Sequence, residues 1–155
     1  MAVDIQIVRA RPSHIRTIAD RMRKADRDEV FAASGRSPPA ALSYSYRKSS
    51  CCWTGIFDGR PELMWGVGDI NILAGVGAPW LLGTNAVEEN FRAFLRISSD
   101  WPAQLLKRYS VLRNFVDVRN TVSVRWLEWL GFRLLDPVEF RGHQFRLFEM
   151  GATDV

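Results

Sequence analysis

Cysteine and histidine are scarce in this sequence of 155 residues, which contains two of each. Cys51 and Cys52 are adjacent, so on a strand their side chains would point to opposite faces and could not easily bridge each other. His14 and His143 lie far apart, and neither has a cysteine or carboxylate at metal-ligand spacing. We therefore predict reduced cysteines that serve in packing, and no metal site.

Long apolar runs and dense basic blocks are also missing. No window approaches the roughly 18 consecutive apolar residues of a membrane-spanning helix, and the N-terminal MAVDIQIVRAR lacks the basic start and apolar core of a signal peptide. We expect no signal peptide, no transmembrane segment and no membrane partner. The 21 Lys and Arg against 17 Asp and Glu give a net charge of +4. These cations are scattered, which leaves a weak nucleic-acid contact open.

Large aromatic side chains are plentiful by contrast. Nine Phe, six Trp and three Tyr, within 47% apolar residues overall, can build one core without disulfides. The length is that of one ordinary domain, and no linker or internal repeat interrupts it. We predict a single domain over residues 1–150 and a flexible tail over residues 151–155.

The first half of the chain predicts helices followed by a hairpin. A short strand over residues 5–8 precedes a helix that starts at Pro12, and Ser37 caps a second helix that ends near residue 46. The segment between them, residues 26–35, is polar and weakly periodic, so two N-terminal helices are expected. Strands over residues 51–57 and 62–68 flank Asp58-Gly59, a strong hairpin signal, and a third strand covers residues 80–82.

The second half of the chain predicts two more helices, which alternate with strands. Residues 85–109 are helical with a break near Pro102, and a strand follows over residues 111–118. Asn120 or Thr121 caps a helix that ends at Gly131. Strands over residues 132–135 and 144–150 close the chain around a turn-prone segment. This order predicts an α/β (α+β) fold, with a mixed sheet and helices on both faces.

The pattern N-x-x-S-x-x-W-L-x-x-x-G-F in the last helix, with this element order, resembles the GCN5-related N-acetyltransferase (GNAT) family. Asn120, Ser123, Trp126, Gly131 and Phe132 match the family pattern. The resemblance implies a mostly antiparallel central sheet of 6–7 strands, and acetyl-coenzyme A as the cofactor of an active member.

The family resemblance also places a cofactor site. The pyrophosphate loop of the family lies between the third strand of the hairpin layer and the long helix, where backbone N–H groups meet a helix N-terminus. This chain has only one glycine there, and Glu88 and Glu89 in the first helical turn would repel phosphates. If acetyl-coenzyme A binds, the resemblance assigns it to Leu82, Gly83, Thr84, Asn85, Ala86 and Asn120.

The catalytic residues that the family resemblance implies are incomplete. The family tyrosine that commonly protonates the leaving thiolate aligns with Leu127, which cannot donate a proton. Asp69, Glu62 or Glu139 could serve as the general base that deprotonates an amine. Strand-edge or loop charges are the more common role for such residues, because no spacing pairs them with a second group.

A narrower resemblance is to the GNAT-like virion proteins of short-tailed bacteriophages. It rests on GDINILAGVGAPWLL, on YSVLRNFVDVRNTVSVRWLEWLGF and on the closing RGHQFRLFEM. It implies a catalytically degenerate virion or assembly protein that contacts other phage structural proteins, in the virion or in the host cytoplasm during assembly, and needs no cofactor. The alternatives are an active N-acetyltransferase that binds acetyl-coenzyme A and, more weakly, a small basic nucleic-acid binder.

Overall fold

A computed structural model describes residues 2–152. The elements, in chain order, are β1 (Ile5–Arg9), α1 (Pro12–Ala19), α2 (Lys24–Ser34), α3 (Pro38–Lys48), β2 (Ser49–Phe57), β3 (Arg60–Asn71), β4 (Val76–Gly83), α4 (Ala86–Glu89), α5 (Phe91–Ser98), α6 (Trp101–Leu105), β5 (Val111–Asp117), α7 (Thr121–Leu130), β6 (Arg133–Leu134), β7 (Val138–Phe140) and β8 (His143–Gly151).

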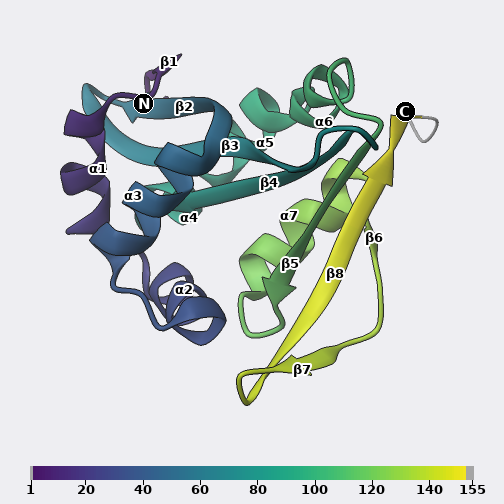
Figure 1. Cartoon of the computed structure of the whole chain (residues 1–155). Coiled ribbons are helices and arrows are strands. Elements are labelled where there is room, and N and C mark those ends of the chain that lie inside the picture. The colour runs from purple at the N-terminus through teal and green to yellow at the C-terminus, as the bar shows by residue number, and fades with distance from the viewer. Residues whose placement is uncertain (1, 153–155) are drawn as a thin grey trace.

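The strands form one sheet in the order β1-β2-β3-β4-β5-β8-β6, and β7 pairs with β8. Every pairing is antiparallel except that of β4 with β5, which is parallel and joins only Val76 to Val111 and Gly77 to Leu112. Beyond these residues β4 and β5 diverge, as Figure 1 shows. The predicted α/β class and mostly antiparallel sheet are confirmed. The sheet has eight strands because β7, in a segment predicted as a turn, pairs with β8.

Helices cover both faces of the sheet, and the alternation of side chains along β3 decides which residues each layer buries. Met64 packs with Ile18 and Leu42 of α1 and α3. Its neighbours Leu63 and Trp65 point to the other face and pack with residues of α4 and α5. The sheet is therefore the middle of three layers (Figure 1).

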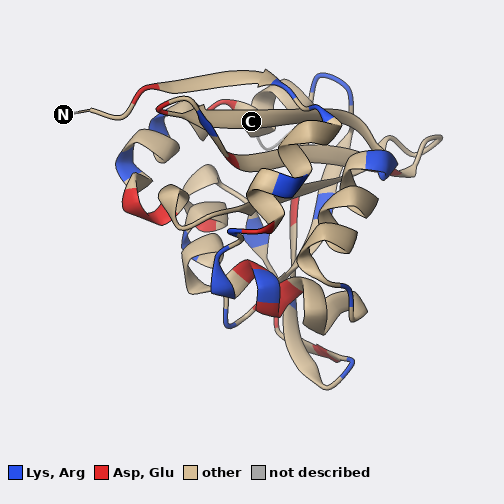
Figure 2. Ribbon diagram, turned by 90° about the vertical axis from the view of Figure 1, so that its left-hand side faces the viewer, with Lys and Arg blue, Asp and Glu red and all other residues tan. Residues whose placement is uncertain are grey.

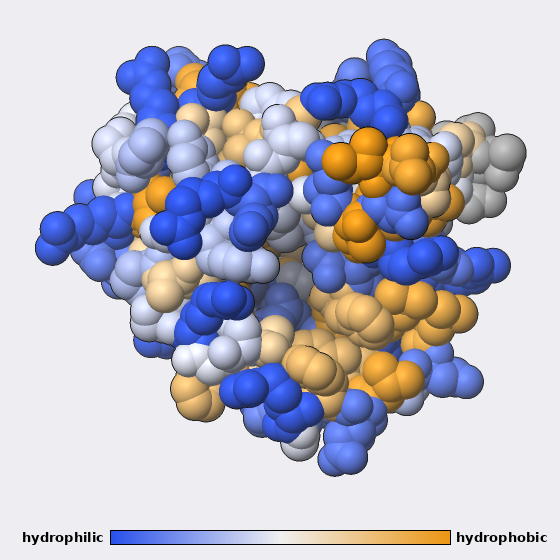
Figure 3. All heavy atoms as spheres, in the orientation of Figure 1, coloured by the Kyte–Doolittle hydropathy of each residue, from blue (hydrophilic) through white to orange (hydrophobic). Residues whose placement is uncertain are grey.

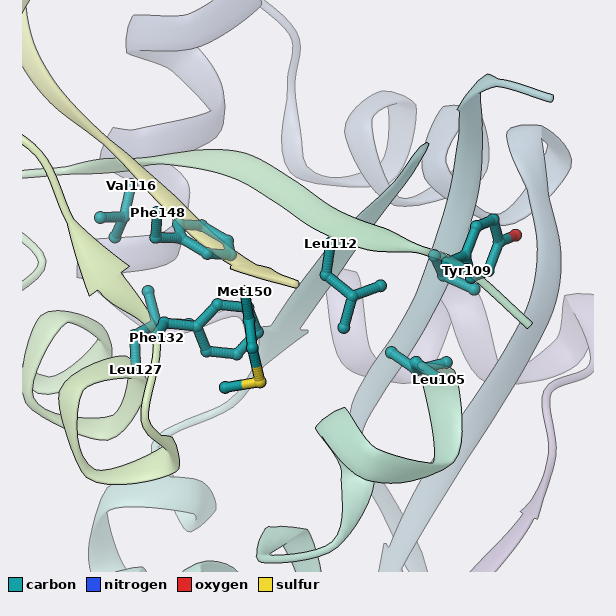
Figure 4. Packing of buried hydrophobic residues seen from close by; sticks show 9 residues of the cluster. Leu105, Tyr109, Leu112, Val116, Leu127, Phe132, Phe148 and Met150 are labelled. Carbon is teal, nitrogen blue, oxygen red and sulfur yellow. The ribbon is translucent and has the colours of Figure 1, made fainter. Parts of the chain in front are cut away.

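A third cluster lies between β5, β8 and the helices α6 and α7 (Figure 4). Leu112 and Val116 of β5 face Leu127 of α7 there, and Phe132 and Phe148 meet edge to face at 5.1 Å between ring centroids. This cluster fixes α7 against the strand that borders the divergent gap.

The predicted helices needed two corrections. Residues 26–35 belong largely to α2, so three N-terminal helices precede β2 instead of two. The α2 helix has no continuous apolar stripe; it buries Asp26 and Ala32, and Gly35 ends it with a φ of 73°. The segment 85–109 is divided into α4, α5 and α6; the expected break near Pro102 is confirmed, and another falls at Asn90.

The C-terminal tail was predicted to be loose from Gly151. Gly151 instead pairs with Val111 in the sheet, and the N–H of Ala152 donates to the Ser110 carbonyl at 2.9 Å. The prediction is therefore wrong for these two residues. Residues 153–155 lie outside the described part of the chain.

Membrane-spanning helices, metal-ligand clusters and the two cysteines were all considered from the sequence, and the structure bears on each. Within residues 2–152, no helix is long and apolar enough to cross a membrane. The same residues contain no group of three or more His, Cys, Asp or Glu side chains that could hold a metal ion. Cys51 and Cys52 are free thiols and half-buried, as expected for packing residues.

Candidate active site

The gap between β4 and β5 holds a cavity of about 590 Å³. Residues of α2 and α3 line it on one side of the sheet, and residues of α6 and α7 line it on the other. The side chain of Asn114 on β5 reaches across the gap and donates to the Pro79 carbonyl of β4 at 2.9 Å. Because both helix layers contribute to one cavity, two reactants could meet there from opposite faces of the sheet.

Arg23, which directly precedes α2, joins the two sides of the gap at its wide end. Its backbone N–H donates to the Gly83 carbonyl at 2.9 Å. Its guanidinium donates to Asn120 Oδ1 at 2.6 Å and to Ser123 Oγ at 3.0 Å. The side chain is only 3% exposed, so these charge-assisted bonds are shielded from water. They hold the end of β4 to the start of α7.

Asp26 completes this network from the first turn of α2. Its Oδ2 accepts a hydrogen bond from the backbone N–H of Gly83 at 2.9 Å, and its Oδ1 accepts one from the Asn120 side chain at 3.1 Å. Oδ1 also pairs with Arg23 at 2.9 Å. Burial raises the pKa of this carboxyl, and the charge of Arg23 opposes that shift. A carboxyl group therefore occupies a backbone N–H that the family resemblance assigned to a phosphate.

The residues predicted to bind acetyl-coenzyme A meet at this end of the gap: Leu82, Gly83, Thr84, Asn85, Ala86 and Asn120. The turn from β4 to α4 contains two residues, and α4 is one turn long. The N–H of Thr84 donates to the Glu62 carbonyl at 2.9 Å, and that of Gly83 is held by Asp26. These two N–H groups are thus used within the chain, and binding of the cofactor here stays a prediction.

Glu88 was expected to repel phosphates from the first turn of the helix. In the structure its carboxylate pairs with Arg23 at 2.6 Å and is 42% exposed. The guanidinium and the solvent therefore reduce its repulsion. Glu89 is exposed as well. The stronger obstacle to a diphosphate is Asp26, because it is buried and contacts the backbone directly.

The three predicted general-base candidates do not come together. Asp69 is exposed near the end of β3 and accepts a hydrogen bond from the Tyr109 hydroxyl at 2.5 Å. Glu62, expected at a strand edge, is instead buried, and accepts hydrogen bonds from Arg21 at 2.9 and 3.0 Å and from the Thr84 hydroxyl. Neither lines the cavity. Glu139 does line it, from the exposed strand β7.

Glu29 is the cavity carboxyl that the sequence reasoning missed. It lies on α2, lines the cavity, and its Oε2 accepts the backbone N–H of Asp117 at 2.7 Å. Among the described residues, Oε1 has no hydrogen-bond partner. Burial, reinforced by the charges of Asp26 and Asp117, raises the pKa of Glu29 to about 8. No local sequence signal marks this residue, because its helix was not predicted.

Leu127 occupies the position that the resemblance assigned to a proton donor. It is buried in the cluster drawn in Figure 4, beside Phe132, and it also borders the cavity. Ser123 of the same helix brings a hydroxyl to the cavity lining, and this hydroxyl accepts a hydrogen bond from Arg23. The helix therefore provides packing where the family has an acid.

Known proteins resemble this chain in fold but not detectably in sequence. No family model matches this sequence. No curated protein sequence matches it either. Solved structures do match, at sequence identities that bear on the fold alone.

The crystal structure of a candidate acetyltransferase superposes with a TM-score of 0.75 at 12% identity, covering 97% of this chain and 87% of that one. A GCN5-related N-acetyltransferase from Kribbella flavida gives 0.65 at 16% identity, covering 95% and 97% of the two chains. The spermidine N-acetyltransferase from Vibrio cholerae, in complex with CoA and spermine, gives 0.69 at 12% identity, covering 97% and 96%. The chain has the GNAT fold.

Proposed function

We propose that this GNAT-fold chain is an N-acyltransferase that transfers an acyl group from a thioester donor to an amine. The observation that carries the proposal is the cavity through the sheet, with Glu29 on its α2 side. A cavity open to both helix layers lets a donor and an acceptor approach from opposite faces and meet between β4 and β5. The acetyltransferases of similar fold support the same reaction class.

Glu29 is the residue we assign to the proton transfer. An amine attacks a thioester carbonyl only as the neutral base, so the ammonium proton must leave first. Glu29 Oε1 takes this proton, and the neutral amine forms the new C–N bond. The C–S bond breaks with its electron pair on sulfur, and the second N–H proton leaves the nitrogen to solvent, which gives the neutral amide. A carboxylate with a pKa of about 8 is well matched to this step near that pH.

The leaving sulfur does not require an acid from α7. Thiols have pKa values near 8.5, so a thiolate leaves readily at the pH where Glu29 is ionised, and it takes its proton from solvent. The presence of Leu127 in place of a tyrosine is therefore compatible with transfer, at a slower rate than a positioned acid would give.

The donor fits this site in part. The apolar gap between β4 and β5, bordered by Trp101 and Trp126, suits the narrow arm that carries a thioester. The diphosphate of acetyl-coenzyme A does not fit at the β4–α4 turn while Asp26 holds the N–H of Gly83. In this conformation a diphosphate must lie outside that turn, or α2 must move.

The hydrogen bond between Asp26 and the N–H of Gly83 also favours a second candidate function, in which the chain binds ligands or proteins without transferring an acyl group. The predicted role in a bacteriophage virion belongs here and stays a prediction, as do its phage partners. The weaker nucleic-acid alternative also stays a prediction; in Figure 2 basic and acidic segments alternate along α2 instead of forming one basic block.

Titration calorimetry with acetyl-coenzyme A, together with release of free thiol in the presence of primary amines, tests the proposal. We expect micromolar binding and a rate that rises with pH through about 8, as the general base ionises. Glu29→Gln should abolish the rise and lower kcat about a hundredfold or more. Asp28→Asn is the matched control, because it removes a neighbouring charge that pairs with Lys24 on the outside of the same helix. Absence of both binding and thiol release would support the second candidate.

A further inference from the structure

The wall of the cavity on the side of α2 and α3 is largely apolar. Val30, Ala33, Trp80 and Phe115 are among the apolar residues there. The apolar lining reaches the open surface at β5 and β7, where Phe115 is 52% and Phe140 54% exposed. Figure 3 shows this apolar area on the face that α3 borders. A ligand that fills the space must have an apolar body.

Charged groups on the cavity wall are few. The ionisable acids and bases that line it are Glu29, Arg36 and Glu139, with the phenol of Tyr44. The Arg36 guanidinium lies over the Tyr44 ring, 4.0 Å from its centroid, so its charge is already engaged in a cation–π contact. Glu139 is exposed on β7. Within residues 2–152, Glu29 is thus the one half-buried carboxyl on this wall, and its Oε1 is available to an incoming donor.

We propose that the acceptor is a monoamine on an apolar body of about the size of a phenylalkyl group, with its ammonium at Glu29 and its body against the walls of the cavity. This inference rests on the proposed function, and it names the acceptor class. One ammonium can be paired by Glu29. A polyamine or aminosugar would place further cations against apolar walls, at a cost in binding, because the other lining carboxylate, Glu139, lies exposed on β7.

The volume agrees with an acceptor of this kind. A cavity of about 590 Å³ lies within the range of small-molecule sites, and it must accommodate the acyl end of the donor as well. The open apolar face beside the mouth leaves room for a longer body. A hydrophobic amine longer than a phenylalkyl group could therefore extend over Phe115 and Phe140.

Titration calorimetry with the full chain, without any donor and at about pH 9, tests the inference through binding alone. At this pH Glu29 is ionised, whereas an alkylammonium, with a pKa of about 10, keeps its proton. The probes are 2-phenylethylamine, its neutral analogue 2-phenylethanol, and spermidine. We expect 2-phenylethylamine to bind at least about tenfold more tightly than either of the others. Glu29→Gln should remove that advantage over the alcohol and leave the affinity for the alcohol unchanged. Asp28→Asn, which makes the same change in net charge on the same helix, should keep it.

Two results would overturn the inference: spermidine binding more tightly than 2-phenylethylamine, or Glu29→Gln binding the amine as the wild type does. Unchanged circular dichroism and thermal midpoint of Glu29→Gln show that the variant is folded. Failure of the proposed function gives a different result, in which the amine binds at Glu29 but no thiol is released from any thioester. Failure of the inference alone gives thiol release with polar amines and no binding of 2-phenylethylamine.

Discussion

Asp26 accepts a hydrogen bond from the backbone N–H of Gly83 at 2.9 Å, across a separation of 57 residues in the sequence. The contact places a carboxyl group from α2 at the end of β4, where the divergent gap is widest. Arg23 and Asn120 hold that carboxyl in place. A diphosphate at the same N–H would have to displace Asp26, so the contact controls access to the donor end of the cavity.

Asp26→Asn should therefore tighten the binding of acetyl-coenzyme A about tenfold. The variant keeps the side-chain size and an oxygen that can accept from Gly83, but it removes a buried negative charge near the phosphates. Calorimetric titration measures the change, and Asp28→Asn, with the same change in net charge, should bind as the wild type. Arg23 loses a partner in Asp26→Asn, so urea unfolding should also show a loss of stability of about 1–3 kcal/mol. Equal affinity of the variant and the wild type would contradict electrostatic repulsion of the diphosphate by Asp26.

Glu29 should make the protein less stable as the pH rises. Its pKa is about 8 in the folded chain, against an ordinary value of 4.5, so between these values the folded state holds a proton that the unfolded state has lost. The free energy of unfolding therefore falls from about pH 4.5 to about pH 8, and this contribution is constant above that range. Glu29→Gln cannot titrate and should lack this decline. Urea unfolding in steps across the window checks it, and parallel curves for the two proteins would rule the effect out.

Glu62→Gln should lower stability without changing the pH dependence of acyl transfer. Glu62 is buried and bound by Arg21 and Thr84, outside the cavity lining. Because Arg21 is partly exposed, the loss should be about 1–2 kcal/mol in urea unfolding. A large loss of kcat with unchanged stability would instead identify Glu62 as the base.

Leu127→Ala should destabilise the chain by about 2–4 kcal/mol, because it opens a hole in the cluster between α7 and β5. Leu127→Met, which nearly conserves volume, should cost less than about 1.5 kcal/mol. Chemical unfolding of both variants gives the comparison. Similar stabilities for the alanine variant and the wild type would show that the residue faces the cavity and not the core.

The local features of the fold were predictable from short segments. The Asp58-Gly59 pair forms the predicted hairpin turn with φ values of 48° and 83°. Asn120 caps α7 by accepting the N–H of Ser123 at 3.4 Å, and Gly131 ends that helix with a φ of 99°. Each of these depends on residues within a few positions of one another. The family resemblance of the α7 sequence, together with the order of the elements, predicted the mixed sheet with helices on both faces.

The sequence by itself thus determined the hairpin, the caps of α7 and the class of fold, because turn and cap residues act on their own neighbours. Only the tertiary structure decided which side chains share the cavity. Glu29 contacts Asp117 across 88 residues and Asp26 contacts Gly83 across 57. Both carboxyl groups come from α2, whose apolar pattern is too weak to predict a helix. Their burial depends on packing between segments that are distant in the sequence. Packing also placed Glu62 in an ion pair and raised the pKa of Glu29, since desolvation exists only once the chain has folded.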